Sequence, residues 1–158
     1  MFLTDLFLGA SISGLIGAVL AVPAIVTEWR SHRHEHHLPI LVDIKPKWGN
    51  RHLTHRELFF VALTVHLILT TLFGAVYVVF VEYGWLFITH APYTFFSLFM
   101  YAIGAWVVTG ALIFPVIGFG VFGKKESNLA WAEILSMTLI LGVILWVLVQ
   151  WFQPAYFS

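Results

Sequence analysis

The chain has 158 residues, of which 60% are hydrophobic, 17% aromatic and 10% charged, and its mean hydropathy is +0.91. Soluble domains carry about 25% charged residues, so this composition excludes an ordinary soluble domain and indicates an integral membrane protein. The chain has no cysteine, which excludes disulfides, thiolate metal sites and cysteine nucleophiles, and its formal net charge of zero does not indicate a nucleic-acid partner.

Four apolar runs cover residues 3–27, 58–81, 93–117 and 129–151. Each is long enough to cross the hydrocarbon core of a bilayer, which takes roughly 20 helical residues. The sequence therefore predicts an all-α membrane protein with a single domain, residues 1–158. We expect its four transmembrane helices to form a compact bundle surrounded by membrane lipid.

Small residues recur every four positions in the first run, at Gly9, Ser13, Gly17 and Ala21. Lipid gives helices no hydrophobic reason to associate, so close backbone approach at small residues has to drive their packing. This stripe predicts the face on which the first helix packs against another helix.

Basic side chains are confined to two connections between the runs. They are Arg30, Arg33, Lys45, Lys47, Arg51, Arg56, Lys124 and Lys125. Because positive charge in short loops stays cytoplasmic, loops 28–55 and 118–128 are expected in the cytoplasm and both termini outside. The location predicted by this pattern is the cell's inner membrane.

Histidines are dense in the first connection. If the first helix continues past Trp29 until Pro39 ends it, Glu28, His32 and His36 share one face, and His52 or His55 can complete four ligands for a divalent metal such as zinc. Two other interpretations stay open. The segment is a hydrated interface whose imidazoles lie next to anionic lipid, or it is a pH switch.

The second helix is predicted to begin at the capping box "THRE", in which Thr54 and Glu57 satisfy each other's backbone amides. His66 lies nine residues further, about 13 Å along the helix axis and near the middle of the bilayer. A titratable group at that depth has to face the bundle interior and be partnered. It is either a packing histidine bonded to a neighbouring helix, or a functional group that relays protons, contacts a substrate or, with a second copy, ligates haem.

Polar and small side chains also share faces on the middle helices. They are His66, Thr70, Gly74 and Tyr77 on the second helix, and Ser97, Tyr101, Ala105 and Thr109 on the third. We interpret both faces as the bundle interior or the seam of a homo-oligomer. Glu133 lies about one turn inside the fourth helix, where it can reach the interface or pair with Lys124 or Lys125.

At the outer side, Tyr83, Trp85 and Tyr93 are typical of an aromatic belt at the membrane surface. Asp5 and Glu82 lie at the same level. We expect both carboxylates to remain hydrated at the outer rim.

The segments that end at Ile25 and Ile117, "GLIGAVLAVPAI" and "GAWVVTGALIFPVI", both carry a proline near the cytoplasmic end, Pro23 and Pro115. Each is followed by a basic loop and another span. A duplicated helical hairpin explains this pattern, as in transporters with parallel repeats.

The segments "VHLILTTLFGAVYVVF" and "GAWVVTGALIFPVIGFGVFG" resemble small four-helix bacterial membrane proteins of the uncharacterised YagU-like kind. The resemblance covers about 100 residues. This chain departs from the pattern of those proteins in the fourth helix, where "AEILSM" stands in place of an expected His-Leu pair. It implies a four-span bundle and no established chemistry.

Motifs of common enzymes are absent: there is no HExxH, Walker loop or GxSxG elbow, so we expect no enzymatic activity. Three functions remain. The chain is a structural or accessory subunit of a homo-oligomer or larger membrane complex, an oligomeric channel or transporter that uses His66 and the polar faces, or a metal- or haem-binding membrane protein.

Overall fold

The computed structural model describes residues 2–30, 47–48, 51–52, 54–85, 93–116, 120–124, 129–153 and 157. Within those ranges, the side chains of Thr27, Glu28, Arg30, His55 and Leu58 and of the four strand residues are not described.

The described chain is helical apart from one antiparallel pair of two-residue strands, β1 (Lys47–Trp48) and β2 (Arg51–His52). The helical elements are α1 (Phe2–Arg30), α2 (His55–Glu82), α3 (Phe95–Val108), the π-helix η1 (Thr109–Ile113), α4 (Phe114–Val116), the 3-10 helix η2 (Val121–Gly123) and α5 (Ala130–Phe152). Four spans, with α3, η1 and α4 forming the third, are long and apolar enough to cross a membrane. The predicted four-helix membrane fold is confirmed.

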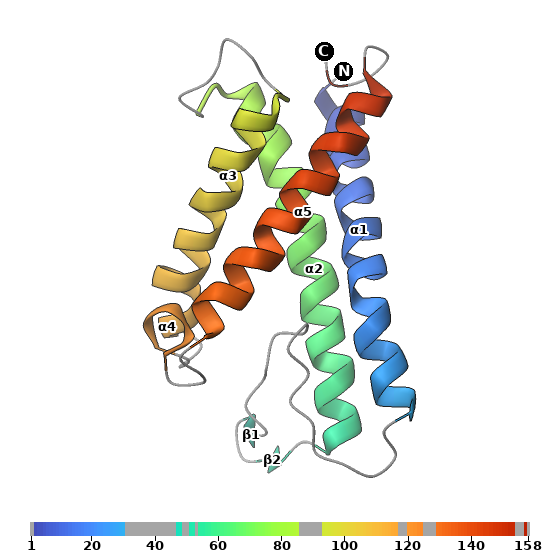
Figure 1. Ribbon diagram of the computed structural model, residues 1–158, viewed down its shortest axis with the longest axis vertical. Coiled ribbons are helices and arrows are strands. Elements are labelled where there is room, and N and C mark those ends of the chain that lie inside the picture. Colours follow the sequence, from blue (N-terminus) through green and yellow to red (C-terminus); the bar gives the residue numbers. More distant parts are fainter. Residues whose placement is uncertain are drawn as a thin grey trace.

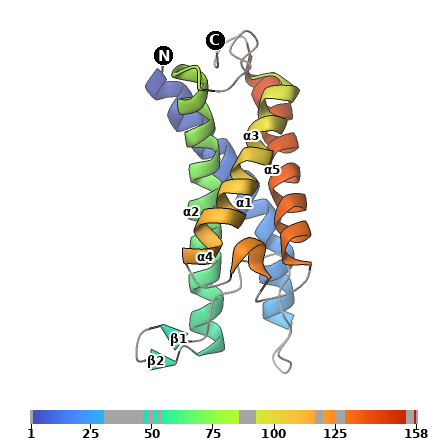
Figure 2. The ribbon, with the colours of Figure 1, turned by 90° about the vertical axis from the view of Figure 1, so that its left-hand side faces the viewer.

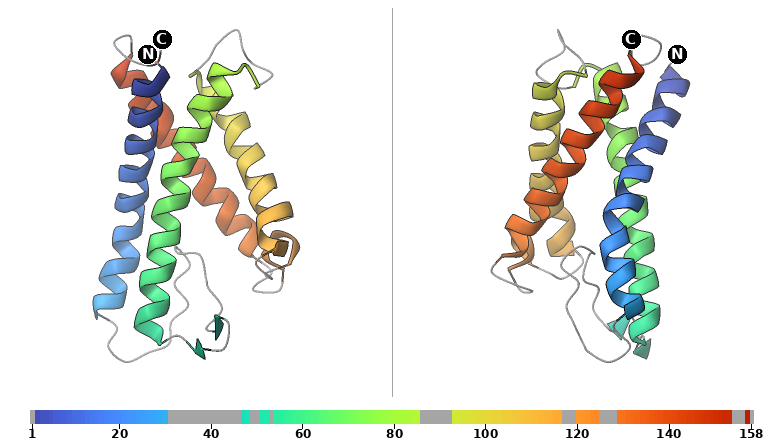
Figure 3. Two further views of the ribbon diagram at one scale, coloured as in Figure 1. Left: turned by 180° about the vertical axis from the view of Figure 1, so that it is seen from behind. Right: turned by 45° about the vertical axis from the view of Figure 1, so that its right-hand side comes forward.

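The spans form two antiparallel hairpins, α1 with α2 and α3 with α5 (Figure 1). The start of α1 and the end of α5 lie at one end of the molecule, which we call the terminal end, and the opposite end is the loop end. The hairpins also contact each other, α1 with α5 and α2 with α3. The side view in Figure 2 shows α1 and α2 together on one side at the terminal end, and α3 and α5 together on the other. Toward the loop end the two hairpins diverge (Figure 3).

Local sequence explains where several helices begin. Thr54 caps α2, accepting a hydrogen bond from the Glu57 amide while the Glu57 carboxylate accepts one from the Thr54 amide, so the predicted capping box is confirmed. Thr94 caps α3 by accepting from the amide of Ser97. α1 runs unbroken through Pro23, whereas Pro115 lies in α4 directly after the π-helix. The two hairpins therefore differ at these prolines, and a common origin stays a prediction.

The predicted small-residue stripe of α1 lies in its contact with α2. A Cβ atom at Gly74 would lie 2.5 Å from the Cβ of Ser13 and against the Gly9 carbonyl, and one at Gly17 would overlap Thr70. Ala21 is fully buried beside Phe59 and Ala62 at the loop-end half of the same contact. Only glycine or a very small side chain fits at these crossing points, which lets the two backbones approach closely.

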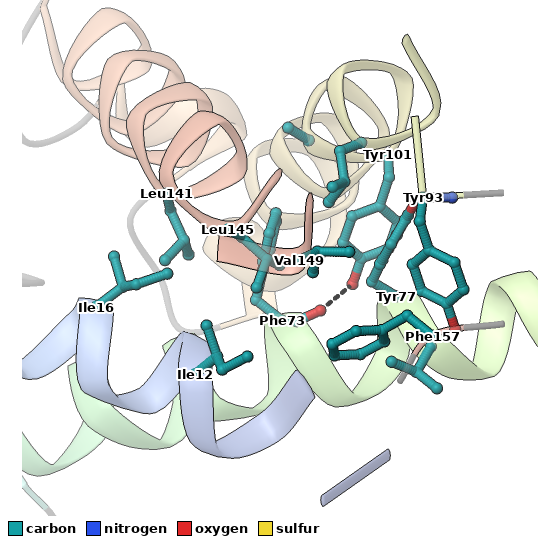
Figure 4. Packing of buried hydrophobic residues seen from close by; sticks show 13 residues of the cluster. Ile12, Ile16, Phe73, Tyr77, Tyr93, Tyr101, Leu141, Leu145, Val149 and Phe157 are labelled. Carbon is teal, nitrogen blue, oxygen red and sulfur yellow. Dashed lines mark hydrogen bonds between the residues drawn. The ribbon is translucent and has the colours of Figure 1, made fainter. Parts of the chain in front are cut away.

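The main core lies between the hairpins at the terminal-end half (Figure 4). It contains Ile12, Ile16, Phe73, Tyr77, Val78, Tyr93, Leu98, Tyr101, Ala102, Leu141, Leu145, Val149 and Phe157. All four spans and both segments outside them at that end contribute to it. The aromatic side chains pack with tilted or edge-on rings, for example Phe73 against Tyr101 at a centroid distance of 4.8 Å.

We predict that Gly74→Ala destabilises the fold by about 1–3 kcal/mol, because its methyl group meets the backbone of α1 and has no room to relax. Gly104→Ala in α3 is the matched control, since a Cβ there has no atom within 4 Å. Unfolding of both variants by denaturing detergent measures the difference. Equal stability of the two would contradict the close α1–α2 contact.

Candidate functional site

His66 is buried in the contact between α1 and α2, with 7% of its surface exposed. Its Nε2–H donates to the carbonyl oxygen of Gly17 at 3.1 Å. The donor has to be the histidine nitrogen, because a carbonyl oxygen only accepts. This is the arrangement expected of a packing histidine bonded to a neighbouring helix.

The side chains around His66 are bonded in the same way. Ser13 in α1 donates its hydroxyl to the carbonyl oxygen of Thr70 at 2.6 Å, across the helix contact. Thr70 in turn donates to the carbonyl oxygens of His66 and Leu67, at 3.0 and 3.1 Å. The polar face predicted on α2 is therefore hydrogen-bonded to α1. Gly17 in α1 and Gly74 in α2 let the two helices approach closely enough for these bonds.

A second polar group lies among the core aromatics (Figure 4). Tyr77 donates its hydroxyl to Ser97 Oγ at 3.0 Å. Tyr101 donates to the carbonyl oxygen of Phe73 at 2.8 Å, the bond drawn in Figure 4. Both bonds join α2 to α3. Among the described residues no buried side-chain nitrogen or oxygen lacks a hydrogen-bond partner.

Two buried residues outside the spans, Tyr93 and Phe157, are hydrogen-bonded to the helices at the terminal end. The Tyr93 amide donates to the Tyr77 hydroxyl, and the Tyr93 carbonyl accepts from Gln150 in α5. The Phe157 amide donates to Asp5 Oδ1 at 3.2 Å, and its carbonyl accepts from Gln153. We call Tyr77, Tyr93, Phe157, Asp5, Gln150 and Gln153 the terminal clasp.

Two expectations about this end are wrong. Asp5 is 7% exposed and accepts a hydrogen bond from the Phe157 amide, so it is not a hydrated rim carboxylate. Tyr93 is 5% exposed and packs against Phe157 with a ring-centroid distance of 5.1 Å, so it does not belong to the surface belt. Tyr83 and Trp85 are exposed as that belt requires.

Burial raises the pKa of the Tyr93 hydroxyl above its usual range, and the negative charge of Asp5 raises it further. Smaller contributions come from Tyr77 and Glu82. Tyr93 is consequently a neutral phenol at physiological pH.

Three predicted candidates remain, Ala105, Thr109 and Glu133. Thr109 begins the π-helix and is half-buried, and Ala105 packs at the edge of the core. Glu133 is exposed in the first turn of α5. The structure does not bring these three residues into one site.

The predicted metal ligands lie largely outside what the structure describes. His32 and His36 fall in the undescribed segment, and the side chains of Glu28, His52 and His55 are not described. In the described ranges no three histidine or carboxylate side chains are grouped to hold a metal ion. The metal site stays a prediction.

A shallow depression on the face shared by α3 and α5 has only apolar lining. Its residues are Phe95, Leu98, Phe99, Ala102, Leu139, Gly142 and Val143. This lining offers no polar group for chemistry.

No family model, curated protein or solved structure matches this chain. The resemblance to YagU-like proteins therefore stays a prediction.

Sequence reasoning missed Phe157, Gln150 and Gln153. The glutamines carried a usable signal, because a polar residue at the end of an apolar run has to find a partner. The partner of Asp5 had no such signal, since Phe157 is 152 positions away in the sequence.

We predict that Tyr101→Phe lowers the free energy of unfolding by about 1 kcal/mol, because it removes a buried hydrogen bond between α2 and α3. Tyr83→Phe makes the same chemical change on an exposed ring and is expected to be neutral. Detergent-induced unfolding compares them. A neutral Tyr101→Phe would mean that this hydrogen bond does not stabilise the contact.

Proposed function

We propose that this multi-pass membrane protein is a structural or accessory subunit of a homo-oligomer or of a larger membrane complex. One observation carries the proposal. The buried polar side chains of its spans are used in hydrogen bonds between or within helices, as Ser13, His66 and Tyr101 illustrate.

A channel or transporter needs polar groups that face water along a path through the membrane. Here the Thr70 hydroxyl and the His66 ring are buried in the α1–α2 contact, each bonded to a backbone carbonyl, and Thr70 packs directly against Gly17. To line a path, these groups would have to give up their helix contacts. The geometry therefore favours packing over conduction.

Large apolar side chains cover the outward faces of every span. Examples, one from each span, are Phe7, Ile68, Leu112 and Val147. Lipid covers such faces in a monomer, and another helix covers them in an assembly. A subunit role requires that at least one of these faces contacts protein.

Photoreactive amino acids at Phe7, Ile68, Leu112 and Val147 test that requirement in intact membranes. We expect a discrete protein adduct of reproducible mass from at least one position, and none from the same amino acid at buried Leu141. Lipid adducts alone at all four exposed positions would contradict the proposal. So would solute or ion flux in proteoliposomes that is lost in a His66→Leu variant of unchanged stability.

We further propose that the protein lies in the inner membrane with its loop end in the cytoplasm, supported by the two basic connections. Because the chain has no cysteine, single cysteines report topology directly. In intact cells, Lys124→Cys is expected to resist an impermeant thiol reagent, and Trp85→Cys to react. Both positions are exposed, so the opposite pattern would reverse the orientation.

A further inference from the structure

Each hairpin has packing of its own at the loop end. In the first hairpin Ala21 and Ala24 of α1 pack against Phe59 and Ala62 of α2. The members of this buried group and the side chain packed against it all come from α1 and α2.

In the second hairpin the chain turns back on itself after the π-helix. The ring of Phe122 lies over Gly110 and packs against Trp106 at a centroid distance of 4.8 Å. The Trp106 indole N–H donates to the carbonyl oxygen of Trp131 at the start of α5, at 3.0 Å. These contacts tie the third span to α5 without using the first hairpin.

At the terminal end the two hairpins share one core and the terminal clasp. Asp5 of the first hairpin holds the chain beyond α5, and Tyr77 of the first hairpin holds the chain before α3. The clasp therefore bonds each end of the second hairpin to a different helix of the first.

The clasp also holds unusual backbone. Tyr93 and Phe157 have φ of 60° and 62°, in the left-handed region that aromatic residues rarely adopt. Such conformations persist only where the surroundings fix them, and here side chains bind both the amide and the carbonyl of each residue. Strained backbone held by a few side-chain bonds is typical of a functional constraint.

We propose that the terminal clasp is the pivot of the molecule, about which the two hairpins move as rigid bodies so that their loop ends change separation. Each hairpin is rigid because its loop-end packing is internal, and the pivot is fixed because the shared core and the clasp lie together at the other end. The motion goes beyond a subunit role and does not depend on it.

Electron paramagnetic resonance distances between pairs of spin labels on the cysteine-free chain test the pivot in lipid nanodiscs. Arg56 with Glu133 spans the two hairpins at the loop end, and Glu82 with Trp151 spans them at the terminal end. Val26 with Phe60 lies within the first hairpin and serves as the control. All six positions are exposed.

We expect the loop-end distance distribution to be about two times broader than the control, as hinge motion requires, and the terminal-end distribution to be as narrow as the control. A loop-end distribution as narrow as the control would overturn the proposal. This comparison needs no change in the clasp itself.

The clasp is then tested by Phe157→Ala, with Phe7→Ala as the matched control on an exposed ring. Phe157→Ala is expected to broaden the terminal-end distribution, and Phe7→Ala to leave it unchanged. Asp5→Leu removes the carboxylate acceptor and is expected to act like Phe157→Ala, whereas Asp5→Asn keeps an acceptor oxygen and is expected to preserve the narrow distribution. Terminal-end widths in both Phe157→Ala and Asp5→Leu that equal the width in Phe7→Ala would show that the clasp does not fix the pivot.

Discussion

Hydrogen-bond satisfaction inside an apolar solvent is the constraint on which this structure depends. Lipid tails offer no partner to a hydroxyl, an imidazole or a carbonyl, so a polar side chain between spans has to bond within the protein. Ser13 and His66 bond to backbone carbonyls across the α1–α2 contact, which is possible only because Gly17 and Gly74 let the helices approach. In this hairpin the hydrogen bonds of the polar side chains therefore depend on the close packing of the two helices.

The same constraint explains where the hairpins meet. Polar side chains that reach from one hairpin to the other, Tyr77, Tyr101 and Asp5, gather toward the terminal end, and the shared core lies there with them. Toward the loop end each hairpin is held by its own contacts, and the hairpins diverge. A molecule whose polar groups serve helix packing in this way is suited to an assembly role.

Much of the architecture follows from the sequence, because it depends on local patterns. Apolar length predicts the four spans, the capping box at Thr54 predicts the start of α2, and four-residue spacing predicts the face on which Gly9 and Ser13 lie. The terminal clasp could not be predicted, because it joins Asp5 to Phe157 across nearly the whole chain and depends on left-handed backbone at two aromatic residues. Apolar periodicity also gives no sign that Asp5 is covered, since burial of a carboxylate depends on its distant partner.

Native mass spectrometry of the untagged protein, extracted in mild detergent, tests the central claim that this chain of 17.9 kDa is a packing subunit. The account predicts a defined multiple of the chain, or the chain with a distinct protein partner. A single chain with lipid alone would contradict it. A species that carries stoichiometric metal or haem would also contradict it, and would make the histidines at positions 32, 36 and 66 the functional centre.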